Sequence, residues 1–218
     1  MISEDNEVVE FVEKLIEIDR LGAEQIFNAV REQRNMSQTV DHLILPALER
    51  IGQGWEDGSI ALAQVYMSSR ICEELMTLIP FPEPPAQAQH TEHARMAIAV
   101  LDDYHLLGKI IVSSCLRASG YTFYDYGRVT AQELANKIQE DSIDIILISA
   151  LMFRSALQIK ELKRLLDQAG SLTHIVVGGA PFRFDSLLWQ EVGADAVGTN
   201  ATEAVAIITS YMKQRSQT

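Results

Sequence analysis

The stretch "AIAVLDDYHLLGKIIVSSCL", Ala97–Leu116, decides the fold class of the chain. Its first residues form an apolar run typical of a buried strand, and apolar residues at helical spacing follow. Two acids, a tyrosine and a histidine lie between the strand and the helix, at the carboxyl end of the strand. Ligands of parallel sheets bind at this edge, so the polar segment from Asp102 to His105 is the first candidate site.

The same alternation continues to the end of the chain. Further strands are expected at "YTFYDYG" (121–127), "DIILISAL" (144–151) and "HIVVGGA" (174–180), with helices near 108–120, 130–140 and 155–170. Residues 182–214 then supply a helix, a short strand and a last helix. This pattern predicts an α/β domain with a doubly wound, five-stranded parallel sheet. The segments expected to converge at its carboxyl edge are "DDYHLLG", "DYGRV", "SALMFRS", "GGAPF" and "GTNA".

The first part of the chain has a different pattern. Apolar residues three and four apart predict four amphipathic helices, at 4–18, 21–33, 39–58 and 60–79, which form a small bundle. Pro46 should kink the third helix or mark its real start. Four of the six prolines fall in the segment that follows, which predicts a linker. The expected organisation is a helical bundle at 1–82, a linker at 83–93 and an α/β domain at 94–218.

Composition and charge exclude several classes of function. The chain has 218 residues and a net charge of −12, so we expect neither nucleic acid nor an anionic membrane as a partner. No apolar run approaches the roughly 20 residues of a membrane span, and the acidic N-terminus lacks a signal core, so we expect a cytoplasmic protein. Cys72 and Cys115 lack metal-ligand spacing and are expected to be packing residues.

Two other doubly wound classes are poorly supported. A receiver domain could use Asp102 and Asp103 for magnesium, but it would also require an aspartate at the end of the third strand, where this chain has "ISALMF". A dinucleotide-binding domain would require a G-x-G-x-x-G turn after a strand, and none of the twelve glycines has that spacing.

Three short motifs at successive strand ends carry a family resemblance. They are D-x-H-x-x-G at Asp103, His105 and Gly108, S-x-L at Ser149 and Leu151, and G-G at 178–179. In this order they resemble the cobalamin-binding domain of corrinoid methyltransferase proteins and of cobalamin-dependent methionine synthase. The bundle, with "ILPALERIGQGWEDGSIALAQV", is similar to the helical cap domain that precedes this fold in the same proteins. The resemblance covers nearly the whole chain.

The spacing of Asp103 and His105 fits this resemblance. Residues two apart in extended backbone point to the same side, so the carboxylate can accept a hydrogen bond from one imidazole nitrogen while the other binds a metal. The resemblance implies that the cofactor is cobalamin with its cobalt, and that His105 displaces dimethylbenzimidazole as the lower axial ligand. It also implies that Ser155 is the outer member of a His, Asp, Ser relay.

Further cofactor contacts are implied by the resemblance. They are Tyr104, Leu106, Leu107, Gly108, Ser149, Leu151, Phe153, Gly178, Gly179 and Ala180, with Val65 and Tyr66 of the cap. The glycines have no β-carbon to obstruct a bulky nucleotide tail. The chain departs from the family pattern at Leu106, where relatives usually carry an acid, and at Phe153 and Arg154, where threonines are usual. For Phe153 and Arg154, contacts with the cofactor and simple packing or surface roles both stay open.

The resemblance implies a protein that is not catalytic alone. It would carry a methyl group on cobalt between a substrate-specific methyltransferase and an acceptor methyltransferase, with a reductive activator as a further partner. The donor could be methanol, a methylamine, a betaine or an aromatic methyl ether. The alternative is a non-enzymatic cobalamin-based sensor. Sensors of this kind carry Glu-His after a tryptophan, whereas this chain carries Val65 and Tyr66 after Trp55, which favours the carrier.

Overall fold

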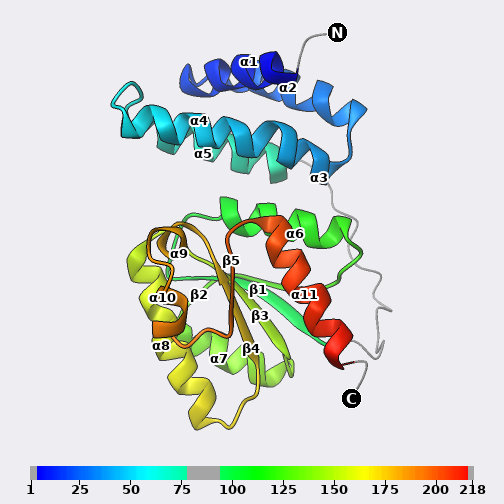
Figure 1. The fold of residues 1–218 in the computed structure, drawn as a ribbon, viewed down its shortest axis with the longest axis vertical. Coiled ribbons are helices and arrows are strands. Elements are labelled where there is room, and N and C mark those ends of the chain that lie inside the picture. Colours follow the sequence, from blue (N-terminus) through cyan, green and yellow to red (C-terminus); the bar gives the residue numbers. More distant parts are fainter. Residues whose placement is uncertain (1–3, 78–93, 216–218) are drawn as a thin grey trace. The chain divides into compact units, whose positions relative to one another are not determined.

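A computed structural model describes residues 4–77 and 94–215 of the chain (Figure 1). The chain divides into two compact units, Met1–Phe81 and Pro82–Thr218, and each is described by itself. The predicted linker at 83–93 lies outside the described residues. Within 4–77 and 94–215, no helix is both long and apolar enough to cross a membrane.

Unit 1 is entirely helical. Its elements are α1 (Glu4–Ile16), α2 (Arg20–Gln33), α3 (Met36–Thr39), a π-helical turn η1 (Val40–Ile44), α4 (Leu45–Glu56) and α5 (Leu62–Thr77). Phe11, Leu15, Phe27 and Ile51 form part of a core from which water is almost completely excluded. Burial of one apolar face of each helix is the main force that holds short helices together, because isolated helices of this length are marginal in water.

The third predicted helix differs in detail from the expectation. It begins earlier, at Met36, and runs through the π-helical turn without a break to Glu56. The Leu45 N–H group donates to Val40 O, five residues back. Pro46 has no N–H group to continue the α-helical ladder, and it lies in the first turn of α4, where that loss costs little. Pro46 therefore marks the start of α4, and the π-helical turn joins α4 to the helix before it.

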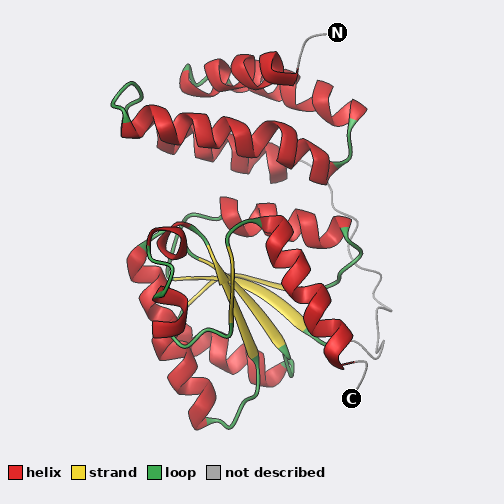
Figure 2. Ribbon diagram, viewed as in Figure 1, coloured by secondary structure: helices red, strands yellow, loops and turns green. Residues whose placement is uncertain are grey.

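Unit 2 is an α/β domain (Figure 2). Its strands are β1 (Met96–Leu101), β2 (Tyr124–Val129), β3 (Ile145–Ser149), β4 (His174–Gly178) and β5 (Ala196–Gly198). Its helices are α6 (Leu107–Ala118), α7 (Ala131–Glu140), α8 (Phe153–Gln168), α9 (Ala180–Phe184), α10 (Leu188–Glu191) and α11 (Ala201–Arg215). The strands are all parallel, in the order β2-β1-β3-β4-β5. The predicted α/β fold with a five-stranded parallel sheet and a helical N-terminal part is confirmed.

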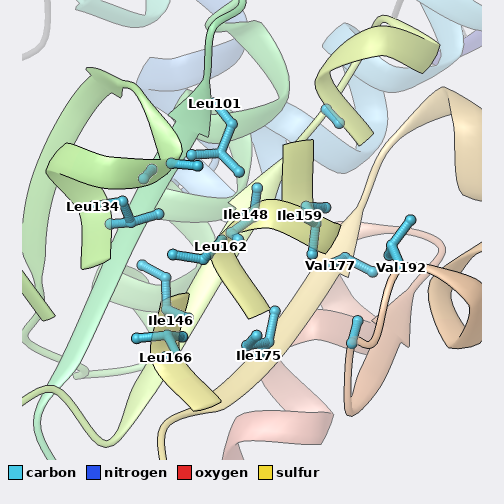
Figure 3. Close-up of a cluster of buried hydrophobic side chains, with 14 of the residues drawn as sticks. Leu101, Leu134, Ile146, Ile148, Ile159, Leu162, Leu166, Ile175, Val177 and Val192 are labelled. Carbon is cyan, nitrogen blue, oxygen red and sulfur yellow. The ribbon is translucent and has the colours of Figure 1, made fainter. Parts of the chain in front are cut away.

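Each face of the sheet has its own core. Residues that point to one face pack with α7 and α8, and they include Leu101, Ile146, Ile148, Leu134 and Ile159 (Figure 3). Residues that point to the other face pack with α6 and α11, and they include Met96, Ile98, Leu147, Leu116 and Ile208. Burial on both faces explains the continuous apolar runs that predicted these strands.

Two boundaries were predicted wrongly. The second strand was expected at 121–127, with "DYGRV" (125–129) as the segment that ends it, but β2 begins at Tyr124 and contains that whole segment. It is an edge strand with several exposed side chains, so its alternation of apolar and polar residues is weak. The helix expected after residue 182 is divided into α9 and α10, because Asp185 has an extended backbone and its carboxylate accepts from the Leu187 N–H group.

Candidate functional site

The candidate site lies where the carboxyl ends of β1 and β3 adjoin. The chain passes from β1 to one neighbour, β2, and then returns beyond β1 to β3, so the strand order reverses between β1 and β3. Such a reversal leaves a crevice outside the strand ends, where ligands of open α/β sheets bind. The segment with Asp103 and His105 follows β1, and the segment Ser149–Met152 includes and follows the end of β3.

Asp102 turns the chain out of β1. Its backbone is left-handed, with φ of 48°, and its N–H group donates to Val129 O at the end of β2. Aspartate is one of the few residues other than glycine that visits this region readily. After this turn the Asp102 side chain is exposed, whereas the side chain of Asp103 is 2% exposed.

The Asp103 carboxylate connects the two segments of the site. Its Oδ1 atom lies 2.6 Å from Nδ1 of His105 and accepts from the His105 N–H group at 3.1 Å. Its Oδ2 atom accepts from the backbone N–H groups of Leu151, at 3.3 Å, and Met152, at 3.1 Å. Burial raises the pKa of Asp103, but the hydrogen bonds from His105 and Met152 outweigh it, and the pKa of this carboxyl lies below its usual range.

This contact determines which nitrogen of His105 is available to a ligand. Because an ionised carboxylate can only accept, the proton of the neutral imidazole lies on Nδ1, and Nε2 keeps its lone pair. The His105 side chain is 35% exposed, although its carboxylate partner is buried. An imidazole oriented by a carboxylate, with its second nitrogen free to donate electrons, is the arrangement that proteins use to bind a metal through one histidine.

Gly108 and Ser149, from two of the predicted motifs, lie next to each other. Gly108 lies in the first turn of α6, and a β-carbon there would lie 2.6 Å from Ser149 Oγ. Any other residue at this position would displace the serine. Leu106 and Leu107, at the start of the same helix, are half-buried.

Gly178 and Gly179 both lie against neighbouring backbone. A β-carbon on Gly179, where φ is 115°, would lie 1.9 Å from Ala150 O. A β-carbon on Gly178 would lie 2.8 Å from Gly198 O. Neighbouring backbone therefore excludes a side chain at both positions. Contacts of these glycines and of Ala180, the first residue of α9, with the cofactor stay a prediction.

Ser155 is buried, but its partner differs from the predicted relay. Its hydroxyl donates to Leu101 O at 2.7 Å, on the backbone of β1. A serine hydroxyl has one proton, so this bond directs that proton away from Asp103. In this structure the backbone amides of Leu151 and Met152 donate to Asp103 Oδ2.

Apolar side chains are exposed around the imidazole. Tyr104 is 73% exposed, and Leu151, Met152 and Phe153 are about half exposed in consecutive positions after β3. A run of exposed apolar side chains beside a polar group is typical of a surface that a ligand covers. Met152, which sequence reasoning missed, contributes both its amide and part of this surface. No motif signals it, because the amide of any residue could donate there.

Two predicted cofactor residues lie in the other unit. Val65 is half-buried and Tyr66 is exposed, both on α5. Their relation to the residues of unit 2 stays a prediction.

Comparison with protein families assigns both units to one class. Residues 96–208 match a family described as a B12 binding domain, and residues 9–79 match a second family with the same description. The fold and the site thus define a two-domain B12-binding protein.

Similar proteins narrow this class. The chain is 30% identical over 190 residues to dimethylamine corrinoid protein 3 of Methanosarcina acetivorans, with 84% of this chain and 87% of the relative covered. It is 29% identical over 191 residues to a corrinoid protein of Desulfitobacterium hafniense, with 85% and 87% covered. The solved structure of the Methanosarcina barkeri monomethylamine corrinoid protein has the same fold, with a TM-score of 0.78, 22% identity, and 96% of this chain and 100% of that chain covered.

This chain therefore belongs to the corrinoid protein family of methyltransferase systems, and its cofactor is cobalamin with its cobalt. The residues at the site fit this cofactor, since a half-exposed imidazole with an oriented Nδ1 lies among exposed apolar side chains.

Proposed function

We propose that this protein carries a methyl group between a substrate-specific methyltransferase and an acceptor methyltransferase, with His105 as the lower axial ligand of cobalt. The observation that carries the proposal is the 2.6 Å contact between Asp103 Oδ1 and His105 Nδ1, which leaves Nε2 as the only ring nitrogen with a free lone pair. Bound cobalamin would supply a cobalt that accepts a methyl group and gives it up again.

The two residues have separate roles in this proposal. Asp103 keeps the proton of the imidazole on Nδ1 and fixes the direction of the ring. His105 would hold the cobalt through the Nε2 lone pair that this contact leaves available, and the charge on Asp103 would strengthen electron donation from the ring. The backbone amides on Oδ2 hold the carboxylate in place.

The remaining cofactor contacts are proposed from the surface around His105. The exposed side chains of Tyr104, Leu151 and Phe153 offer apolar area to a flat ring system, and Gly108 and Ser149 border the crevice. We propose that Val65 and Tyr66 of unit 1 also contact the cofactor.

The partners are proposed from the names of the relatives. The similar proteins are corrinoid proteins of dimethylamine and, with 26% identity over 214 residues, of trimethylamine. Among the donors considered from the sequence, these names favour a methylated amine. The first partner would then be a methylamine-specific methyltransferase, the second an acceptor methyltransferase, and a reductive activator would restore the reduced cofactor.

Electron paramagnetic resonance of the Co(II) form tests the ligand. Protein labelled with nitrogen-15 at histidine is reconstituted with unlabelled cobalamin, so the splitting of the signal changes only if a protein imidazole binds cobalt. His105→Ala should abolish the effect of labelling. His174→Ala is the matched control, because His174 also lies near a carboxylate, 3.7 Å from Asp195, but at the start of β4. A wild-type signal that does not respond to labelling would overturn the proposal.

A further inference from the structure

The edge strand β2 contains a one-residue bulge beside the site. Ile98 pairs with Asp125 and Val100 pairs with Arg128, so β2 advances by three residues where β1 advances by two. Gly127, in the left-handed region with φ of 62°, lies within this interval. Bulges are uncommon in parallel pairs, and near a binding site they commonly redirect a side chain.

The bulge changes which side chains face which side of the sheet. Tyr126 packs on the core beneath α7 and α8, and Val129, three residues later, lies in that same core opposite Leu101. In an uninterrupted strand Val129 would point to the other face, since side chains alternate. The extra residue therefore buries Val129 and turns Arg128 to the face that carries α6.

Arg128 in this position contacts the residue between Asp103 and His105. Its guanidinium carbon lies 3.7 Å from the centroid of the Tyr104 ring. A planar cation stacked on an aromatic face is attracted by the ring and restricts its motion. Tyr104 is 73% exposed, so most of its surface faces solvent. The stacking contact with Arg128 is a specific restraint on this side chain.

A second contact joins β2 to the start of α6 on the same face. Lys109 is almost fully buried, and its Nζ atom lies 2.6 Å and 2.5 Å from the two carboxylate oxygens of Asp125. Asp125 also accepts from the N–H group of Gly127, within the bulge. The segment from Tyr104 to Lys109 is thus held to β2 at both ends, with His105 between the two contacts.

We propose that Arg128 is a positioning residue for His105. By stacking on Tyr104 it restricts the segment after β1, so that Nδ1 of His105 stays on Asp103 and Nε2 stays directed away from it. The part of this inference that concerns cobalt rests on the proposed function, whereas the restraint on the segment is a property of the protein without cofactor.

Hydrogen exchange of the cofactor-free protein tests the restraint. In Arg128→Ala, the amides from Tyr104 to Leu107 should exchange about two- to five-fold faster, as expected for loss of one exposed cation–π contact. Tyr104→Ala should have the same effect, and the double variant should add nothing to either single variant. Lys137→Ala is the matched control, because it removes a cation from another tyrosine of β2, Tyr126, on the opposite face.

The Co(II) spectrum tests the consequence for the ligand. With histidine labelled as above, Arg128→Ala should lose part of the protein-nitrogen signal at a cobalamin concentration that gives the full signal in wild type and Lys137→Ala. Unchanged exchange in Arg128→Ala, additive single variants, or faster exchange with an undiminished protein-nitrogen signal would each overturn the inference. A wild-type spectrum without a protein-nitrogen signal would instead refute the proposed function. The hydrogen-exchange result alone would then test whether Arg128 restrains the segment after β1.

Discussion

The carboxylate of Asp103 lies 2.6 Å from Nδ1 of His105, two residues along the chain. Its other oxygen is bound by backbone amides 48 and 49 residues away, in the segment after β3. One buried side chain therefore orients the imidazole and joins the segments that follow the neighbouring strands β1 and β3. The first two predictions concern this double role.

Replacing Asp103 with asparagine should destabilise unit 2. The amide offers one oxygen and one NH₂ group to partners that all donate, so either orientation places a donor against a donor. Leaving buried donors without an acceptor costs about 1–3 kcal/mol in the free energy of unfolding. Urea denaturation would measure it, with Asp102→Asn as the control, since Asp102 is exposed and asparagine also tolerates its left-handed backbone. Equal stabilities of the two variants would contradict the double role of Asp103.

The contribution of Asp103 should depend on pH in one direction. Its pKa is lower in the folded protein than in the unfolded chain, so its stabilising effect is fully present above the unfolded pKa of about 3.9 and is lost as pH falls through the folded pKa. The stability difference between wild type and Asp103→Asn should therefore shrink as pH falls from about 5 through the range in which Asp103 becomes protonated. Urea titrations at a series of pH values in this acid range would show this, and a difference that stays constant or grows across it would refute it.

Gly179 should tolerate no side chain. Gly179→Ala places a β-carbon 1.9 Å from Ala150 O in a backbone conformation that is essentially restricted to glycine, so the free energy of unfolding should fall by more than about 3 kcal/mol. Gly170→Ala is the control, because Gly170 also has a positive φ but nothing within 4 Å of its added β-carbon, and it should cost about 1–2 kcal/mol. Similar losses of unfolding free energy in both variants would mean that backbone strain alone, without the clash with Ala150 O, accounts for the requirement for glycine at position 179.

Both thiols should be inert in the folded protein. Cys72 and Cys115 are buried thiols, and burial raises the pKa of Cys72 to about 12. Since the thiolate is the reactive form, a colorimetric disulfide reagent at pH 8 should modify neither thiol quickly in buffer and both in urea. Rapid modification of a thiol in the native state would show that the helix that carries it opens.

The proposed contact of unit 1 with the cofactor predicts a change in light sensitivity. Tyr66→Ala should remove cover from the cofactor, so protein reconstituted with methylcobalamin should lose its methyl group faster under illumination. Leu21→Ala is the control, because Leu21 is also an exposed large hydrophobic side chain of the same unit, on α2. Identical photolysis rates in wild type and Tyr66→Ala, followed by the visible spectrum, would remove Tyr66 from the proposed contact.

Much of this protein could be predicted from the sequence, because its decisive signals are local. The apolar runs of β1, β3 and β4 are buried on both faces, and such strands are recognisable without knowledge of their neighbours. The pairing of Asp103 with His105 is also local, since two residues of one short segment need no distant partner to meet. The alternation of strands and helices then limits the sheet to a parallel one.

Tertiary structure alone decided the contacts between distant segments. The amides that hold Asp103, the backbone oxygen that excludes a side chain at Gly179 and the Leu101 carbonyl that binds Ser155 have no signature in the sequence, because every residue offers the same backbone groups. The position of Arg128 over Tyr104 depends on a bulge that shifts alternation by one residue. A pattern of period two cannot reveal such a shift until the neighbouring strand sets the register.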